Sequence, residues 1–197
     1  MEARELLQAA IEKFSHGADS SEIRPGRKKF LDDITCSDDK EGLRMIETIG
    51  GERNNMVILA GKQQDGTSGV VSFSFVRKEG FFALQVISTI AEFIPTEQVV
   101  LGFKMENGKE VISGFVFPPV EVEGTHYWAN YAQLAPEDIG AFMESPVVAW
   151  QLKNKLNNNH MESDFTILAT DILPQSEAKY LIQSMAAAIA RDYLASI

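Results

Sequence analysis

Cysteine is almost absent from this chain, which limits how its fold can be stabilised. The single cysteine, Cys36, excludes a disulfide within the chain. The sequence also lacks an apolar run near the roughly 18 residues that span a bilayer. It has neither the charged start and apolar core of an export signal nor an Asn-X-Ser/Thr glycosylation site. Together these absences predict a cytoplasmic protein that has no membrane partner.

Positive charge is the second shortage. The chain has 18 Lys and Arg against 28 Asp and Glu, a net charge of −10, and the acidic excess extends over its whole length. Because neutralisation of phosphates supplies most non-specific affinity for nucleic acids, we expect no nucleic-acid partner. The one basic cluster, at residues 24–29, is followed by four aspartates at 32, 33, 38 and 39. We interpret this stretch as a self-neutralising loop rather than a ligand patch.

Apolar residues are plentiful enough for a sizeable core. They make up 45% of the 197 residues, so a chain of this size can bury about 70% of its surface without a metal or a disulfide. Near the N-terminus, Leu7, Ile11 and Phe14 recur at helical spacing, which predicts a short amphipathic helix over residues 3–14 that ends near 15–17.

The next segment, residues 16–42, shows no periodicity and contains Pro25-Gly26, which indicates a long polar loop. We therefore expect two parts: an N-terminal helix and polar loop over 1–42, and a single α+β domain over 43–197. The apolar stripe of the helix would dock on that domain, on a second copy of the chain or on a partner.

From about residue 55, short runs of β-branched and aromatic residues alternate with small polar ones, as at 71–75 and 82–86. Period-two alternation predicts strands with one buried face. The sharpest local signal is Asn107-Gly108 between Val99–Met105 and Val111–Phe117, because Asn-Gly suits the positive φ angles of a two-residue type I′ hairpin.

That turn predicts a register for the hairpin. Pairing Glu106 with Lys109 places Phe103 opposite Ile112 and Leu101 opposite Gly114, which leaves one face of the hairpin mostly apolar.

The second half of the chain predicts a helix over 136–144 that begins with Pro136, then strands at 147–152 and 165–169. A long final helix opens at Pro174. Its predicted buried side comprises Ile182, Ala186, Ile189, Tyr193 and Ile197, broadened by Leu181 and Met185. Consecutive strands without alternating helices indicate the α+β class: a largely antiparallel sheet packed by a C-terminal helix, with an N-terminal helix on a long loop.

The sequence contains only weak matches to motifs for phosphate or metal binding. Gly61–Ser68 has the glycine spacing of a phosphate-binding loop but lacks its lysine, so Asp65-Gly66 is interpreted as a hairpin turn. His160, Glu162 and Asp164 could offer metal ligands, but the preceding run of asparagines favours a solvated polar turn.

Two further motifs are also interpreted without a chemical role. Cys36 lies among carboxylates, which disfavour its thiolate, so we expect it to be unreactive. Glu121 and Glu123 share a strand face and are expected to be exposed. We assign no catalytic residue, no metal site and no cofactor.

The most distinctive segment concentrates His126, Tyr127, Trp128 and Tyr131 within six residues. Such side chains either close the edge of a core or form a recognition surface. With the helical stripe of Leu7, Ile11 and Phe14, they complete the candidate binding residues.

These observations favour a non-enzymatic, acidic binding module of the adaptor, chaperone-like or inhibitor type that recognises another protein. The protein partner could be basic, and a homo-oligomer is left open. The alternative is an enzyme or small-molecule receptor whose pocket lies between sheet and helices near His126, Trp128 and Tyr131. A purely structural subunit is a third interpretation.

Overall fold

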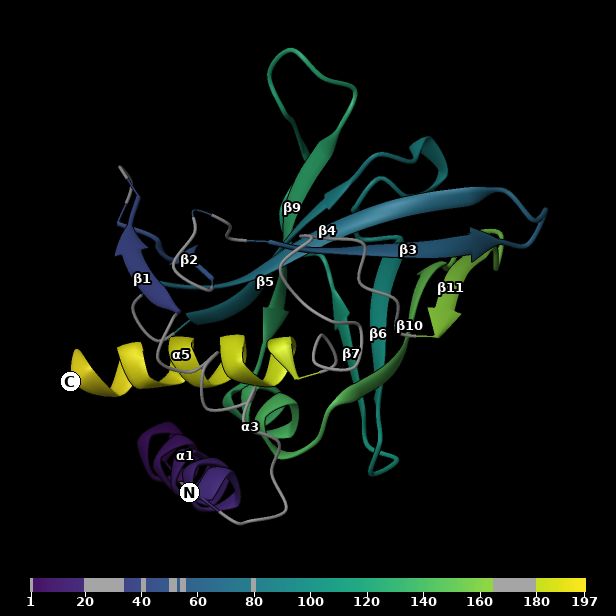
Figure 1. Cartoon of the computed structure of the whole chain (residues 1–197). Coiled ribbons are helices and arrows are strands. Elements are labelled where there is room, and N and C mark those ends of the chain that lie inside the picture. The colour runs from purple at the N-terminus through teal and green to yellow at the C-terminus, as the bar shows by residue number, and fades with distance from the viewer. Residues whose placement is uncertain are drawn as a thin grey trace.

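The computed structural model describes residues 2–19, 34–39, 42–49, 53, 56–78, 81–164 and 180–197. Figure 1 shows an antiparallel sheet with helices packed beneath it. The helices are α1 (Ala3–Asp19), α3 (Pro136–Glu144) and α5 (Leu181–Ala195), with a short 3-10 helix η1 (Ala91–Phe93). The strands are β1 (Thr35–Asp38), β2 (Arg44–Thr48), β3 (Val57–Gln63), β4 (Ser68–Lys78), β5 (Phe81–Ser88), β6 (Val99–Met105), β7 (Glu110–Gly114), β8 (Val120–Glu121), β9 (Trp128–Leu134), β10 (Val147–Asn154) and β11 (His160–Asp164). The predicted α+β class is confirmed.

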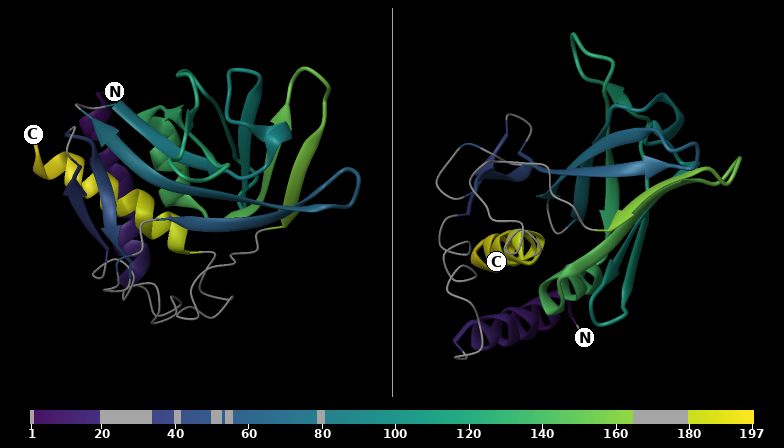
Figure 2. Two further views of the ribbon diagram at one scale, coloured as in Figure 1. Left: turned by 90° about the horizontal axis from the view of Figure 1, so that it is seen from above. Right: turned by 45° about the vertical axis from the view of Figure 1, so that its right-hand side comes forward.

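The sheet runs in the order β7-β6-β10-β11-β3-β4-β5-β9-β8, with the β1–β2 pair added beside β4. Two contacts join β7 and the residue after it to β9. Phe115 forms an antiparallel bridge with Ala132, and the Ser113 hydroxyl donates a hydrogen bond to the Gln133 carbonyl. The β7 end of the order therefore meets β9, the strand next to its other end, and the sheet curls around its own interior (Figure 2).

Aromatic side chains fill that interior. Phe103 packs edge-on against Phe73, with ring centroids 5.3 Å apart. From α3, Phe142 inserts its ring against Phe75 at 5.2 Å and against Phe103 at 5.3 Å. The prediction of α3 is confirmed from Pro136 to Glu144, and this helix closes one end of the curled sheet.

Helix α5 lies between the sheet and α1, as the views in Figures 1 and 2 agree. The predicted burial of Ile182, Met185 and Ile189 is confirmed, since each is 0% exposed. Burial extends further than one face, however: every residue from 181 to 190 is buried, because α1 and α3 cover the side that faces away from the sheet. Toward its end the helix emerges, and Ile197 is 59% exposed. Its predicted start at Pro174 lies outside the described residues, as does the predicted strand at 165–169.

Helix α1 extends to Asp19, so the predicted end near residues 15–17 is wrong. A glycine inside a helix costs only about 1 kcal/mol relative to alanine, which is less than the burial of the stripe supplies. Leu7, Ile11 and Phe14 are buried in the same core as residues of α3 and α5.

The segment predicted as a loop over 16–42 contains strand β1, which pairs with β2. Its sequence, Thr-Cys-Ser-Asp, has no apolar alternation, so the strand depends on backbone pairing and could not be recognised from its pattern. Ile34 before the strand is buried, whereas Thr35 and Asp38 within it are exposed. Residues 20–33 of the predicted loop lie outside the described part. The predicted domain boundary at 42/43 falls between these two paired strands.

The hairpin at Asn107-Gly108 is confirmed as an antiparallel β6–β7 pair, but its predicted turn is wrong. The N–H of Met105 donates to the Lys109 carbonyl at 2.8 Å, and the N–H of Gly108 donates to the Met105 carbonyl at 3.0 Å. Gly108 has a φ of +85°, whereas Asn107 has no positive φ. This is a three-residue loop built on a type I turn with a glycine bulge, rather than a two-residue type I′ turn.

The register is consequently shifted by one residue. Phe103 pairs with Val111 and Gly102 with Ile112, so the predicted pairing of Phe103 with Ile112 is wrong. Val111 faces the core, and Ile112 is 66% exposed. Since side chains alternate across a strand, a single added loop residue turns every side chain of β7 to the opposite face.

Candidate functional site

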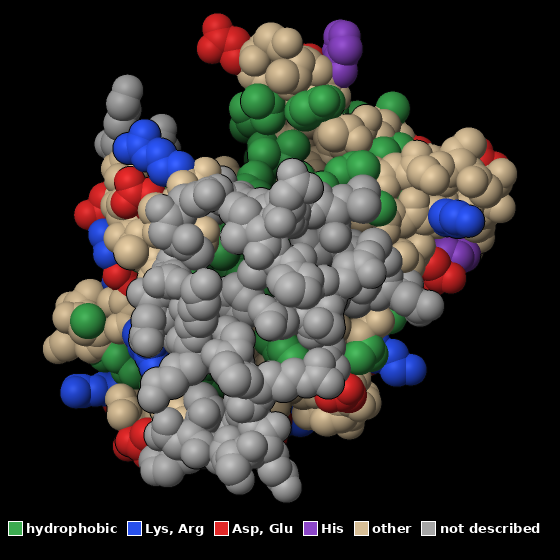
Figure 3. All heavy atoms as spheres, in the orientation of Figure 1, with side chains coloured by type: hydrophobic (Ala, Val, Ile, Leu, Met, Phe, Trp, Pro, Cys, Tyr) green, Lys and Arg blue, Asp and Glu red, His purple; other side chains and the backbone are tan. Residues whose placement is uncertain are grey.

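Large apolar side chains gather on the outside of the molecule along one stretch of chain. Five of the seven large exposed hydrophobic residues in the described part lie between residues 112 and 127. We call them the β7–β9 surface; they are Ile112 (66% exposed), Val116 (62%), Phe117 (51%), Val120 (67%) and Tyr127 (46%). Figure 3 shows hydrophobic side chains gathered at the base of the projecting loop, with acidic and histidine side chains at its tip.

Buried hydrogen bonds hold this stretch in place. Asn130, 2% exposed, donates its amide to the carbonyls of Phe117 at 2.5 Å and Pro95 at 2.6 Å. Val120 pairs with Ala129 in the β8–β9 ladder. The loop beyond turns at Gly124, whose φ is +75°. The surface is therefore carried by an ordered backbone.

The predicted aromatic segment contributes only part of this surface. Tyr127 belongs to it, and His126 is fully exposed, with its ring 3.9 Å from the Glu121 carboxylate. Trp128 and Tyr131 are half-buried in β9 and stand on opposite faces of the strand, because their positions differ by three residues. They therefore do not line one pocket mouth together with His126.

The remaining surface residues were missed by sequence reasoning for a specific reason. The predicted register assigned Ile112 and Val116 to the apolar inner face, and the one-residue shift turns both outward. The adjacent prolines, which cannot donate to a sheet ladder, are the signal that could have marked residues 116–120 as lying outside the main strand.

The other predicted binding residues have a different environment. Leu7, Ile11 and Phe14 are 0%, 9% and 3% exposed, so the stripe docks on the parent fold, which was one of its three expected destinations.

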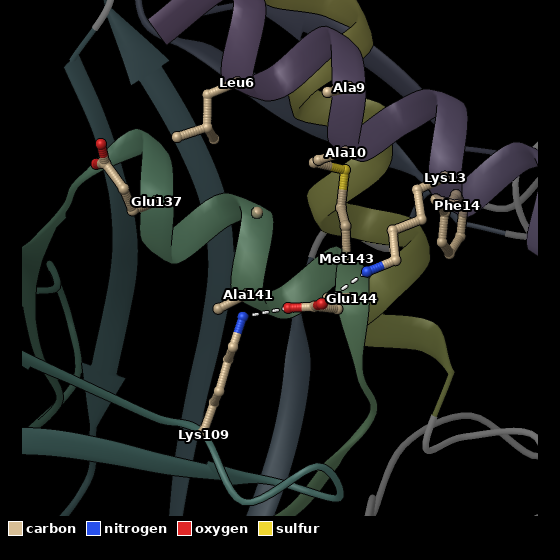
Figure 4. Close-up of a pocket in the computed structure, with 11 residues that line it drawn as sticks. Leu6, Ala9, Ala10, Lys13, Phe14, Lys109, Glu137, Ala141, Met143 and Glu144 are labelled. Atoms are coloured by element: carbon tan, nitrogen blue, oxygen red, sulfur yellow. Dashed lines mark hydrogen bonds and ion pairs between the residues drawn. The ribbon is translucent and has the colours of Figure 1, made fainter. Parts of the chain in front are cut away.

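A shallow groove of about 580 Å³ lies between α1, α3 and the β6–β7 turn (Figure 4). Its apolar lining comprises Leu6, Ala9, Ala10, Phe14, Gly140, Ala141 and Met143. Glu144 accepts a hydrogen bond from Lys13 at 2.8 Å and another from Lys109. The hydrogen bonds from Lys109 and Lys13 lower the pKa of Glu144 to about 2. Glu144 thus pairs with both lysines, and a second carboxylate, Glu137, also lines the groove.

A second polar cluster joins the end of α5 to the sheet. Asp192 accepts hydrogen bonds from Arg44 Nε at 3.0 Å and Arg77 Nε at 2.8 Å, and its own carbonyl accepts a bond from Arg77 Nη2 at 3.0 Å. Arg77 also lies over the Tyr193 ring at 5.8 Å. Burial raises the pKa of Asp192, but hydrogen bonds from both arginines outweigh it and hold that pKa below its ordinary value.

Cys36 lies beside this cluster. The pKa of its thiol is raised to about 11, mainly by burial and also by the neighbouring Asp192 carboxylate, while the charges of Arg44 and Arg77 act in the opposite direction. The predicted direction is confirmed, although burial rather than adjacent carboxylates is the main cause.

The metal-ligand pattern does not assemble into a site. His160, Glu162 and Asp164 lie on strand β11, so the predicted polar turn is wrong at these residues. His160 instead hydrogen-bonds to Gln64 at 3.0 Å. Within the described ranges no three His, Cys, Asp or Glu side chains could hold a metal ion. The Asp65-Gly66 turn is confirmed as the hairpin between β3 and β4, with Gly66 at a φ of +84°.

No family model, curated protein or solved structure matches the chain. Among the helices that the structure describes, none is long and apolar enough to cross a membrane.

Proposed function

We propose that this chain is a non-enzymatic binding module that recognises a basic segment of another protein through the β7–β9 surface. The observation that carries the proposal is the gathering of Ile112, Val116, Phe117, Val120 and Tyr127, all at least 46% exposed, on sixteen consecutive residues. These residues are neighbours along the chain. Exposed apolar patches are typical of interaction sites, whereas single exposed apolar residues are ordinary.

The energetics favour coverage of this surface. Full burial of one large apolar side chain stabilises by about 1.5–3 kcal/mol, and about 1.4 kcal/mol changes an affinity tenfold. Completing the burial of two or three of these half-exposed side chains is therefore enough to control whether a complex forms.

The charge around the surface supports a basic partner. Residues 110–127 contain three acidic side chains and neither lysine nor arginine. Two of them, Glu121 and Glu123, are exposed in the same stretch as the apolar residues. Complementary charge increases association rates and excludes partners of like charge. A second copy of this chain would bring the same acidic side chains together, so a basic protein fits better than self-association.

The test compares the full chain with the variant Ile112→Ser/Val120→Ser. Leu156→Ser is the matched control, because Leu156 is 74% exposed but lies in the β10–β11 turn. The full chain is immobilised, and the proteins that it retains from an extract of the cells that make it are identified and purified. Their binding to the chain and to each variant is then measured by calorimetry at several salt concentrations.

We expect the double variant to bind at least about tenfold more weakly, the control to match the wild type, and binding to weaken as salt rises. Equal binding by the double variant, or no partner retained by the wild type, would overturn the proposal. Circular dichroism of each variant separates loss of binding from loss of folding.

A further inference from the structure

The β6–β7 turn contains the only Asn-Gly pair in the sequence, Asn107-Gly108. Both residues are exposed to solvent. The side-chain amide of an asparagine can be attacked by the backbone nitrogen of the residue that follows it. Glycine in that following position favours the attack, because it has no side chain to obstruct the approach. The pair therefore marks Asn107 as the asparagine of this chain that is most prone to covalent change.

The reaction needs only water and a base such as hydroxide. The base removes the proton of the Gly108 N–H, and the nitrogen forms a bond to the side-chain carbonyl carbon of Asn107. The C–N bond of the side-chain amide breaks, and its nitrogen takes up a proton and leaves as ammonia, which closes a succinimide ring. Water then opens the ring at either carbonyl and leaves aspartate or isoaspartate at position 107.

The fold restrains both reacting groups. The N–H of Gly108 donates to the Met105 carbonyl at 3.0 Å. The side-chain oxygen of Asn107 accepts the N–H of Lys109 at 3.0 Å. The backbone N–H of Asn107 donates to the hydroxyl of Ser145, a residue only 4% exposed, at 3.1 Å. The Gly108 nitrogen must leave its carbonyl partner before it can attack the amide, so the turn must open before the ring can close.

We propose that Asn107 is a deamidation site whose rate the fold controls: the closed β6–β7 turn blocks succinimide formation, and opening of the turn permits it. Segments of a folded protein open locally at a lower free energy than the whole domain unfolds. Deamidation at Asn107 therefore records how often this turn opens, and it is independent of the binding function proposed above.

The product affects the hairpin through its backbone. In isoaspartate the main chain runs through the former side-chain carbons, which lengthens the loop. Loop length sets the β6–β7 register, in which Phe103 pairs with Val111. The isoaspartyl product should therefore be less stable than the variant Asn107→Asp, which carries the same added charge on an unaltered backbone.

The test incubates the full chain in mildly alkaline buffer, with and without urea. Peptide mapping by mass spectrometry follows the conversion of each asparagine. Asn157 is the internal control, because it is exposed in the β10–β11 turn and is followed by asparagine rather than glycine. The variant Ser145→Ala removes the acceptor of the Asn107 N–H and leaves the reacting pair unchanged. Ion exchange separates the isoaspartyl product for urea unfolding beside Asn107→Asp.

We expect Asn107 to convert at least about tenfold faster in urea than in the folded chain, and in urea at least about tenfold faster than Asn157. Ser145→Ala should raise the rate in the folded chain only, and the isoaspartyl product should unfold at lower urea than Asn107→Asp. Equal rates at Asn107 and Asn157 in urea would overturn the assignment of the site. Equal rates in the folded and unfolded wild type would refute control by the turn, and this comparison decides the matter even if Ser145→Ala fails to fold.

Discussion

The Arg44–Asp192–Arg77 cluster yields the most quantitative prediction about stability. Asp192→Asn would leave Arg77 without its carboxylate partner, although that arginine side chain is only 8% exposed. Removal of one partner from a buried ion pair costs about 3–5 kcal/mol. Because Arg44 is 27% exposed and can regain water, we expect the lower end, about 3 kcal/mol.

Urea unfolding at pH 7 measures this loss, and thermal unfolding should show a fall in Tm of about 6–12 °C for a chain of this size. Asp38→Asn is the control. Its carboxylate lies 3.4 Å from Arg44 and is 61% exposed, so its removal should change stability by no more than about 0.5 kcal/mol. An Asp192→Asn variant within about 0.5 kcal/mol of the wild type would refute the reasoning.

The pH dependence provides a second check on the same residue. The folded-state pKa of Asp192 is below its ordinary value of 3.8. Its stabilising effect is therefore full above that value and disappears as pH falls through the folded pKa. The difference between wild type and Asp192→Asn should shrink in acid, and a difference that is constant down to complete acid unfolding would contradict the electrostatic explanation.

Three other predictions concern separate parts of the fold. Gly61→Ala should destabilise by about 1–3 kcal/mol in urea unfolding, because a new Cβ would lie 2.8 Å from the buried indole of Trp150, whereas Gly114→Ala, with nothing within 4 Å, should be tolerated. The Glu144 carboxylate, whose pKa is lowered from 4.5 to about 2, should stabilise the fold fully above pH 4.5 and lose this effect as pH falls toward 2, so urea titrations of Glu144→Gln should show a weaker acid dependence. Cys36, with its pKa raised to about 11, should react with iodoacetamide at pH 8 far more slowly in the folded than in the urea-unfolded chain, and equal rates by mass spectrometry would contradict its burial.

The sequence predicts the helices and strands of this fold better than the register in which the strands pair. Asn107-Gly108 and Asp65-Gly66 both indicate hairpins, and both turns place a left-handed glycine at the end of a three-residue loop. Two-residue and three-residue hairpin loops both favour a glycine with positive φ, so residue types alone cannot distinguish the two loop lengths. Hydrophobicity could not decide either, because Val111 and Ile112 place apolar groups on both faces of β7.

The candidate site was correspondingly only half predictable. Tyr127 stands out as an aromatic residue in a turn-rich segment, but the exposure of Val116 and Val120 follows from register and from the closure of the sheet, which are long-range properties. Local periodicity likewise finds the Leu7 stripe without indicating what covers it. The burial of ten successive residues in α5 depends on packing from two opposite sides, which no single-face pattern predicts.

That burial has a consequence for the order of events during translation. Helix α5 packs on β1, β2, β4, α1 and α3, elements encoded up to about 190 residues earlier. While the ribosome is still synthesising residues 181–190, the surfaces that they will cover must remain open to water or to a chaperone. Contacts between such distant segments also slow folding, because a long loop must close before they form. The chain should therefore acquire its cooperative native state only after release of α5, and truncation before residue 181 should yield an aggregation-prone intermediate rather than a smaller stable domain.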